Sequence, residues 1–148
     1  SERPAPDYIA RVGKPEDLPA LLAEADVVVN ALPLTPATRN LFDAKLFGAM
    51  KRSALFINVG RGGTVVTADL VAALENRTIG GAGLDVTEPE PLPREHPLWR
   101  APNVIITPHM AGGSDLGFEA QLRVLRANIQ RYVSGGKLLS VVDMRRAY

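Results

Sequence analysis

Residues 54–63 read ALFINVGRGG, an apolar run followed by an arginine set between glycines. The run at residues 54–59 predicts a strand that is buried on both faces. The glycines that follow allow a ligand or neighbouring backbone to approach the turn closely. Arg61 therefore carries a permanent positive charge at the end of a predicted strand. We interpret it as a residue at the rim of a cleft, although by itself it could equally satisfy backbone carbonyls or a surface carboxylate.

Other apolar runs and segments with helical spacing alternate on either side of this strand. The predicted strands are residues 26–32, 54–59, 80–86 and 103–108, and the predicted helices are residues 16–25, 43–51, 67–76 and about 114–134. This alternation predicts an α/β fold, with a parallel sheet covered by helices on both faces and a long C-terminal helix.

Polar loops follow each predicted strand. Ligands of parallel sheets bind outside the carboxyl ends of the strands, so these loops are expected to gather at one ligand-binding edge. The chemically capable residues that they carry are Asn30, Arg61, Asp85, Glu90 and His109. The convergence of these five residues is the main indication of a functional site.

Three of these side chains suit a substrate with a carboxylate next to a carbonyl. The planar fork of Arg61 matches a carboxylate, and His109 can give or accept a proton near neutral pH. Glu90 can orient His109 and favour its protonated form. Each also has a structural interpretation, because Glu90 lies in a proline-rich acidic loop and a lone histidine is more often structural. Asp85, at the end of an apolar strand, can serve as a cap.

Composition limits the other functional classes. The chain has 148 residues, a formal net charge of +1, 22% charged residues and no cysteine. With charges this nearly balanced, the chain lacks the excess of basic residues that is typical of nucleic-acid binding. No apolar run is long enough to span a membrane. The absence of cysteine fits a reducing compartment, so we expect a cytoplasmic protein. We expect no metal site, and the sequence contains no G-x-G-x-x-G motif.

Four segments together resemble the C-terminal part of the D-isomer-specific 2-hydroxyacid dehydrogenases. They are ADVVVNALPLTPATRNLFD (residues 25–43), MKRSALFINVGRGGTVVTADLVAALENRTIGGAGLDVTEPEPLP (50–93), HPLWRAPNVIITPHMAGGS (96–114) and VVDMRRAY (141–148). The resemblance covers essentially the whole chain. It implies a partial Rossmann-like parallel sheet, with residues 1–113 as the C-terminal portion of the NAD(P)-binding domain and 114–148 as a helix and tail returning toward a substrate domain.

The resemblance also assigns roles. It implies reversible reduction of a 2-keto acid to a D-2-hydroxy acid with NADH or NADPH, by a homodimer. The implied catalytic residues are Arg61, Glu90 and His109. The implied cofactor-binding residues are Leu32, Pro33, Val59, Gly60, Arg61, Asp85, His109, Ala111 and Gly112.

The chain departs from the family where the phosphates of the cofactor would bind. The family's G-x-G-x-x-G loop and most of its substrate domain have no counterpart here, so we expect a fragment that is inactive alone. Without its partner, the last helix is expected to expose apolar residues around Leu122, Leu125 and Ile129. The alternative function is that of the family's corepressors, which sense the dinucleotide and bind other proteins on the same scaffold.

Overall fold

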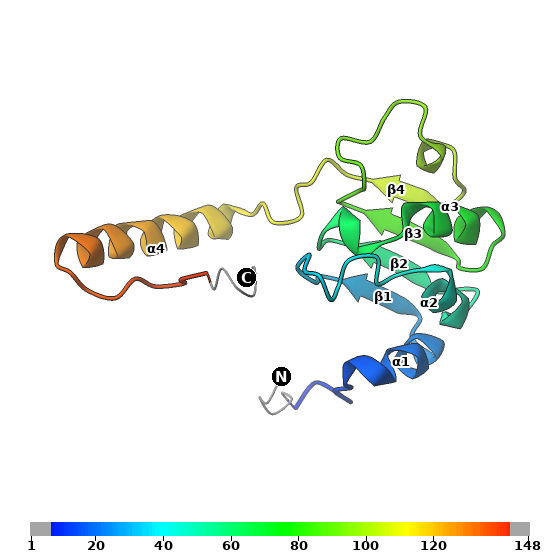
Figure 1. The fold of residues 1–148 in the computed structure, drawn as a ribbon, viewed down its shortest axis with the longest axis horizontal. Helices are drawn as coiled ribbons and strands as arrows, with labels where there is room; N and C mark the ends of the chain where they lie inside the picture. Colours follow the sequence, from blue (N-terminus) through cyan, green and yellow to red (C-terminus); the bar gives the residue numbers. More distant parts are fainter. Residues whose placement is uncertain (1–6, 143–148) are drawn as a thin grey trace.

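The computed structural model describes residues 7–142, apart from the side chains of residues 115 and 116, and the motif at 141–148 lies mostly outside the described residues. Figure 1 shows a sheet with its helices and a long helix set apart from it. In chain order, the elements are η1 (Pro15–Asp17), α1 (Leu18–Glu24), β1 (Val27–Asn30), α2 (Ala44–Ala49), β2 (Leu55–Asn58), η2 (Gly62–Thr64), α3 (Thr67–Glu75), β3 (Gly81–Leu84), η3 (Pro97–Trp99), β4 (Val104–Ile106) and α4 (Asp115–Val133).

The four strands form one parallel sheet in the order β1-β2-β3-β4. One row of paired residues crosses the whole sheet: Val28, Phe56, Ala82 and Val104. Each strand lies inside a run predicted from the sequence, so the α/β class and the parallel sheet are confirmed. The parallel order brings the four carboxyl ends to one edge, as expected.

The core lies between one face of the sheet and the helices that pack on it. Phe56 of β2 stacks against Phe42 and Phe47, with ring centroids 4.9 and 5.3 Å apart. Leu70 and Leu74 of α3 are buried in the same cluster. Asp43 caps α2 by accepting a hydrogen bond from the Leu46 amide, at 2.9 Å, which satisfies a donor at the start of this short helix. These contacts hold the sheet that carries the site.

The prediction that helices cover both faces of the sheet is wrong for the described residues. Val29 of β1 and Ile105 of β4 are 60% and 72% exposed. The cause is the strand order: consecutive strands are added in one direction, and right-handed crossovers then place every connecting helix on the same face. In agreement, α2 contacts both α1 and α3, and Figure 1 shows α2 and α3 on the same side. Covering both faces requires a reversal of strand order that residues 7–142 do not contain.

The long helix α4 begins as predicted and stands apart from the sheet (Figure 1). Ser114 caps it by accepting a hydrogen bond from the Gly117 amide, at 2.9 Å. Leu125 and Ile129 are 54% and 55% exposed, and Leu122 is half-buried, so the expected apolar exposure is confirmed. Neither α4 nor any other helix described in residues 7–142 has the length and hydropathy to cross a membrane.

Candidate active site

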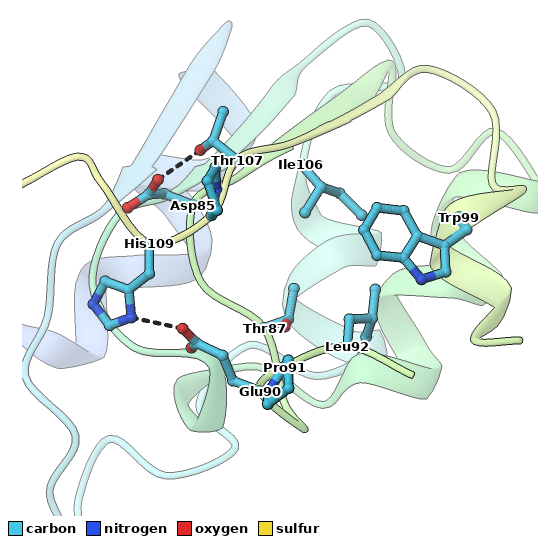
Figure 2. Close-up of a pocket in the computed structure, with 10 residues that line it drawn as sticks. Asp85, Thr87, Glu90, Pro91, Leu92, Trp99, Ile106, Thr107 and His109 are labelled. Atoms are coloured by element: carbon cyan, nitrogen blue, oxygen red, sulfur yellow. Dashed lines mark hydrogen bonds and ion pairs between the residues drawn. The ribbon is translucent and has the colours of Figure 1, made fainter. Parts of the chain in front are cut away.

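The loops after β3 and β4 bring Glu90 and His109 together. Nδ1 of His109 lies 2.7 Å from Oε1 of Glu90. Figure 2 shows the two side chains meeting across the mouth of a pocket. Both are partly exposed, with 45% of the His109 side chain and 39% of the Glu90 side chain accessible. The pair is therefore fixed in orientation and still open to a ligand.

The pocket beside this pair has a volume of about 340 Å³. Its wall away from the pair is apolar and includes Leu92, Trp99 and Ile106 (Figure 2). The indole Nε1 of Trp99 donates to the Pro93 carbonyl at 2.8 Å, which fixes the ring of this half-exposed residue. The arrangement offers a polar rim and an apolar wall, as small-molecule sites usually do.

Asp85 holds the turn that carries His109. Its Oδ1 accepts hydrogen bonds from the Thr107 hydroxyl, at 2.6 Å, and from the Met110 amide, at 2.9 Å. Its Oδ2 accepts from the Ala111 amide at 2.8 Å. The backbone carbonyl of Asp85 accepts from the His109 amide at 2.9 Å. His109 itself adopts a left-handed conformation with φ of +53°, which these bonds on both sides of it maintain.

The pKa of Asp85 is lowered below its ordinary value, chiefly by the hydrogen bond from Thr107. The amides of Ala111 and Met110 lower it further, whereas burial acts in the opposite direction. The charged form of Asp85 is thus the form that the folded turn stabilises. Stability from this group is present above its unfolded pKa and is lost as the pH falls through the lowered folded pKa.

We expect Asp85→Asn to weaken the acid dependence of unfolding. The wild-type melting temperature should fall as the pH drops below the ordinary aspartate pKa of about 3.9 and then through the lowered folded pKa of Asp85. The variant should start lower at neutral pH, because an amide NH₂ cannot accept the Ala111 hydrogen bond, and its curve should approach the wild type in acid. Melting temperatures followed by circular dichroism over this range test the prediction.

Asp26→Asn is the matched control, because this carboxylate is 83% exposed and pairs with Lys51 at the surface. Surface ion pairs contribute little to stability, so this variant should keep the wild-type pH dependence. Parallel curves for the wild type and Asp85→Asn would contradict the assigned stabilisation.

Arg61 lies on a loop that packs directly against the loop leading to Glu90. A Cβ placed on Gly62 would lie 1.9 Å from the Thr87 carbonyl oxygen, so only glycine allows this approach. The guanidinium of Arg61 donates from Nη1 to the Gly60 carbonyl at 2.7 Å. The structure therefore brings Glu90 and His109 into contact and packs the loop of Arg61 against Thr87, with the Arg61 head group bonded to the Gly60 carbonyl.

The residues predicted to bind the cofactor lie along the same edge of the sheet. Leu32 and Val59 are each 38% exposed, and Pro33 and Gly112 are exposed. A Cβ on Gly60 would lie 2.6 Å from the Leu32 carbonyl oxygen, so the loops after β1 and β2 are in close contact.

These exposed apolar side chains, with Asp85 and His109 beside them, fit the nicotinamide half of a dinucleotide. A loop for the phosphate half is not encoded in the chain. The predicted contact of Asp85 with the cofactor stays a prediction. Within the described residues, no group of three or more acidic or histidine side chains is placed to hold a metal ion.

Sequence reasoning missed two polar residues beneath the site. Asn58 and Thr64 are fully buried and hydrogen-bonded with Asn30, which the sequence predicts to be one of the five residues at the ligand-binding edge and which the structure buries. The signal available in the sequence was a single asparagine closing each of two apolar strands. Whether these side chains point outward to a ligand or inward to each other depends on packing, and the structure places them inward.

Residues 2–111 match the family described as D-isomer specific 2-hydroxyacid dehydrogenase, NAD binding domain. The chain belongs to this family. The parallel sheet, the partial Rossmann-like fold and the NAD(P) cofactor class predicted from the resemblance are those of the family.

Relatives of this chain include a glyoxylate/hydroxypyruvate reductase A from Yersinia enterocolitica, 35% identical over 142 residues, which are 96% of this chain and 45% of the relative. A glycerate dehydrogenase from Methylorubrum extorquens is 42% identical over 121 residues, which are 80% of this chain and 38% of the relative. Among solved structures, an NADPH-dependent glyoxylate/hydroxypyruvate reductase from Sinorhizobium meliloti in complex with NADP and sulfate has a TM-score of 0.82 at 42% identity. That match covers 92% of this chain and 44% of the reductase.

The chain therefore spans less than half the length of each of these three relatives. Two of these relatives are named glyoxylate/hydroxypyruvate reductases and one is named a glycerate dehydrogenase, and the Sinorhizobium meliloti reductase is described as NADPH-dependent. None of them supports the corepressor-like alternative.

Proposed function

We propose that the complete protein containing this chain reduces a 2-keto acid to a D-2-hydroxy acid with NADH or NADPH. The contact between Glu90 and His109, at 2.7 Å on the carboxyl edge of the sheet, is the observation that carries the proposal. Arg61, on the loop packed against that of Glu90, completes the proposed site. The reductase names of the relatives support the reaction class.

His109 is the proposed acid in the direction of reduction. Its Nδ1 faces Glu90, so Nε2 is the ring nitrogen left to exchange a proton with a substrate oxygen. Glu90 accepts the hydrogen bond from Nδ1 and fixes the orientation of the ring. His109 then protonates the carbonyl oxygen as it becomes a hydroxyl.

Arg61 is the proposed carboxylate-binding residue. Its fork can bind a carboxylate through two parallel hydrogen bonds and polarise the adjacent carbonyl. To do so, the guanidinium exchanges its bond with the Gly60 carbonyl for the substrate. A reduced nicotinamide, when bound, would supply the hydride for the carbonyl carbon, and the exposed side chains of Leu32 and Val59 would be among the residues that hold it.

The relatives indicate the proposed substrate class, and the composition indicates the proposed cellular location. We propose small 2-keto acids, with glyoxylate and hydroxypyruvate first, because relatives carry those names. A cytoplasmic location fits the absence of cysteine. We further propose that the complete enzyme is a homodimer, with residues 1–113 in the NAD(P)-binding domain and residues 114–148 returning toward the substrate domain.

The test is turnover by the complete protein. Purified enzyme is incubated with NADH or NADPH and glyoxylate, hydroxypyruvate or pyruvate, and consumption of the reduced nicotinamide is followed by absorbance. We expect reduction of at least one acid to its D-hydroxy product, and a severe loss in the Arg61→Lys variant, because lysine lacks the fork. If the folded complete protein reduces none of these acids, the proposed function is contradicted. If the Arg61→Lys variant keeps ordinary activity, the proposed role of Arg61 is contradicted.

A further inference from the structure

Three buried polar side chains lie beneath the loops of the proposed site. We call Asn30, Asn58 and Thr64 the polar brace; they are 2%, 1% and 0% exposed. Fully buried polar groups are costly unless they are hydrogen-bonded. Every buried polar side-chain atom in the described part of the chain has a partner. The brace is therefore a completely bonded network inside an otherwise apolar core.

The brace joins three separate segments of the chain. Nδ2 of Asn30, at the end of β1, donates to Oδ1 of Asn58, at the end of β2, at 3.0 Å. The same Nδ2 donates to the hydroxyl of Thr64, in η2, at 2.7 Å. Asn30 thereby ties the ends of two neighbouring strands to the turn that follows Arg61.

The remaining bonds of the two asparagines hold the backbone of the predicted cofactor loops. Oδ1 of Asn30 accepts from the Leu32 amide at 3.2 Å. Oδ1 of Asn58 accepts from the Gly60 amide at 3.1 Å. Each asparagine thus fixes the direction in which the chain leaves its strand.

The carbonyl of Arg61 is the third point that the brace holds. It accepts from the Thr64 hydroxyl at 2.7 Å and from Nδ2 of Asn58 at 3.3 Å. The Thr64 amide also donates to it, at 3.2 Å. Two side chains of the brace therefore set the backbone from which the Arg61 guanidinium extends.

We propose that Asn30, Asn58 and Thr64 are positioning residues for substrate and cofactor binding. This inference rests on the proposed reductase function. A well-packed apolar core would hold the strands together equally well, but it would not specify the path of the loops above it. A network in which each donor has a defined acceptor permits only one arrangement of these loops.

The first test compares two variants of Thr64 in the complete protein. Thr64→Val keeps the shape but removes the hydroxyl, which leaves Asn30 and the Arg61 carbonyl each without one bond. We expect kcat/KM for the keto acid to fall about 10- to 100-fold, because small displacements of binding groups have effects of this size. Thr64→Ser keeps the hydroxyl and should remain within a few-fold of the wild type.

Leu74→Ala is the control for lost stability. Leu74 is buried in the core on α3, so this variant should be destabilised while kcat/KM is retained at temperatures where it stays folded. Should Thr64→Val fail to fold, Thr64→Ala is compared with Thr64→Ser in its place. Equal kcat/KM in the hydroxyl-free variant and in Thr64→Ser would overturn the proposal.

A second measurement does not depend on activity. Hydrogen exchange of the Leu32 amide is followed by NMR in the 148-residue chain, for the wild type and Thr64→Val. Within the described residues Thr64 makes no hydrogen bond to Leu32, but both are bonded to Asn30, so faster exchange at Leu32 would show that the network acts as a unit. Unchanged exchange at Leu32 would contradict the proposal that Asn30, Asn58 and Thr64 act as one network. If the complete wild-type protein reduces no keto acid but the Leu32 amide exchanges faster in Thr64→Val, the proposed function is wrong and the positioning role of the brace is still supported.

Discussion

Replacement of His109 by glutamine in the complete protein is expected to lower kcat for keto-acid reduction by about 100- to 10,000-fold, the usual contribution of a positioned acid or base. Glutamine can hydrogen-bond to a carbonyl but cannot deliver a proton to it. The existing geometry favours this result, because Nδ1 is bonded to Glu90 and Nε2 remains free for the substrate. Steady-state kinetics with saturating reduced nicotinamide measures the effect.

His96→Gln is the matched control, because the chain contains only two histidines. Nδ1 of His96 accepts from the Leu98 amide at 3.2 Å and caps η3, away from Glu90. We expect this variant to keep kcat within a few-fold of the wild type. Equal losses in the two variants would show that folding, and not proton transfer, explains the effect of His109→Gln.

Replacement of Gly62 by alanine is expected to lower the free energy of unfolding of the 148-residue chain by about 3 kcal/mol, at the upper end of the usual cost of overpacking. The added Cβ would lie 1.9 Å from the Thr87 carbonyl oxygen and 2.1 Å from the Thr87 carbonyl carbon. Both are backbone atoms, so no side-chain rotation can relieve the overlap. The loops of Arg61 and Glu90 must separate, and the proposed site should be lost with them.

Gly48→Ala is the control within the same chain. Gly48 lies in α2, and a Cβ there meets no atom within 4 Å. This variant should be stabilised by about 0.5–1 kcal/mol, because alanine favours a helix over glycine. Chemical denaturation followed by circular dichroism measures both variants. A Gly62→Ala chain as stable as the wild type would show that the two loops are not packed as the structure has them.

Most of the fold could be predicted because it depends on local patterns. The apolar runs around Val28, Phe56 and Ala82 are strands that pair in one row, and Asp43 caps its helix as its sequence position indicates. The coverage of the sheet could not be predicted in this way. An apolar run shows that a strand can be buried, whereas the crossovers determine on which side a helix lies. Val29 is exposed for that reason.

Part of the candidate site could also be predicted from the sequence, and part of it could not. Parallel strands end at one edge, so sequence order alone indicated that Glu90 and His109 lie close together. The structure gives that contact a distance and an orientation. It also shows Arg61 bonded to the backbone carbonyl of Gly60, which is the alternative that the sequence left open for this side chain.

The amino-acid sequence by itself determined the order of strands and helices, the loops at the carboxyl edge and the family to which the chain belongs. Periodicity and spacing between near neighbours encode the order of the elements and the loops, whereas the resemblance of four whole segments indicates the family. Only the tertiary structure decided that Asn30 and Asn58 turn inward to meet Thr64, which lies 34 residues beyond Asn30. A buried polar side chain must find a hydrogen-bond partner, and which partner is within reach depends on how distant segments pack.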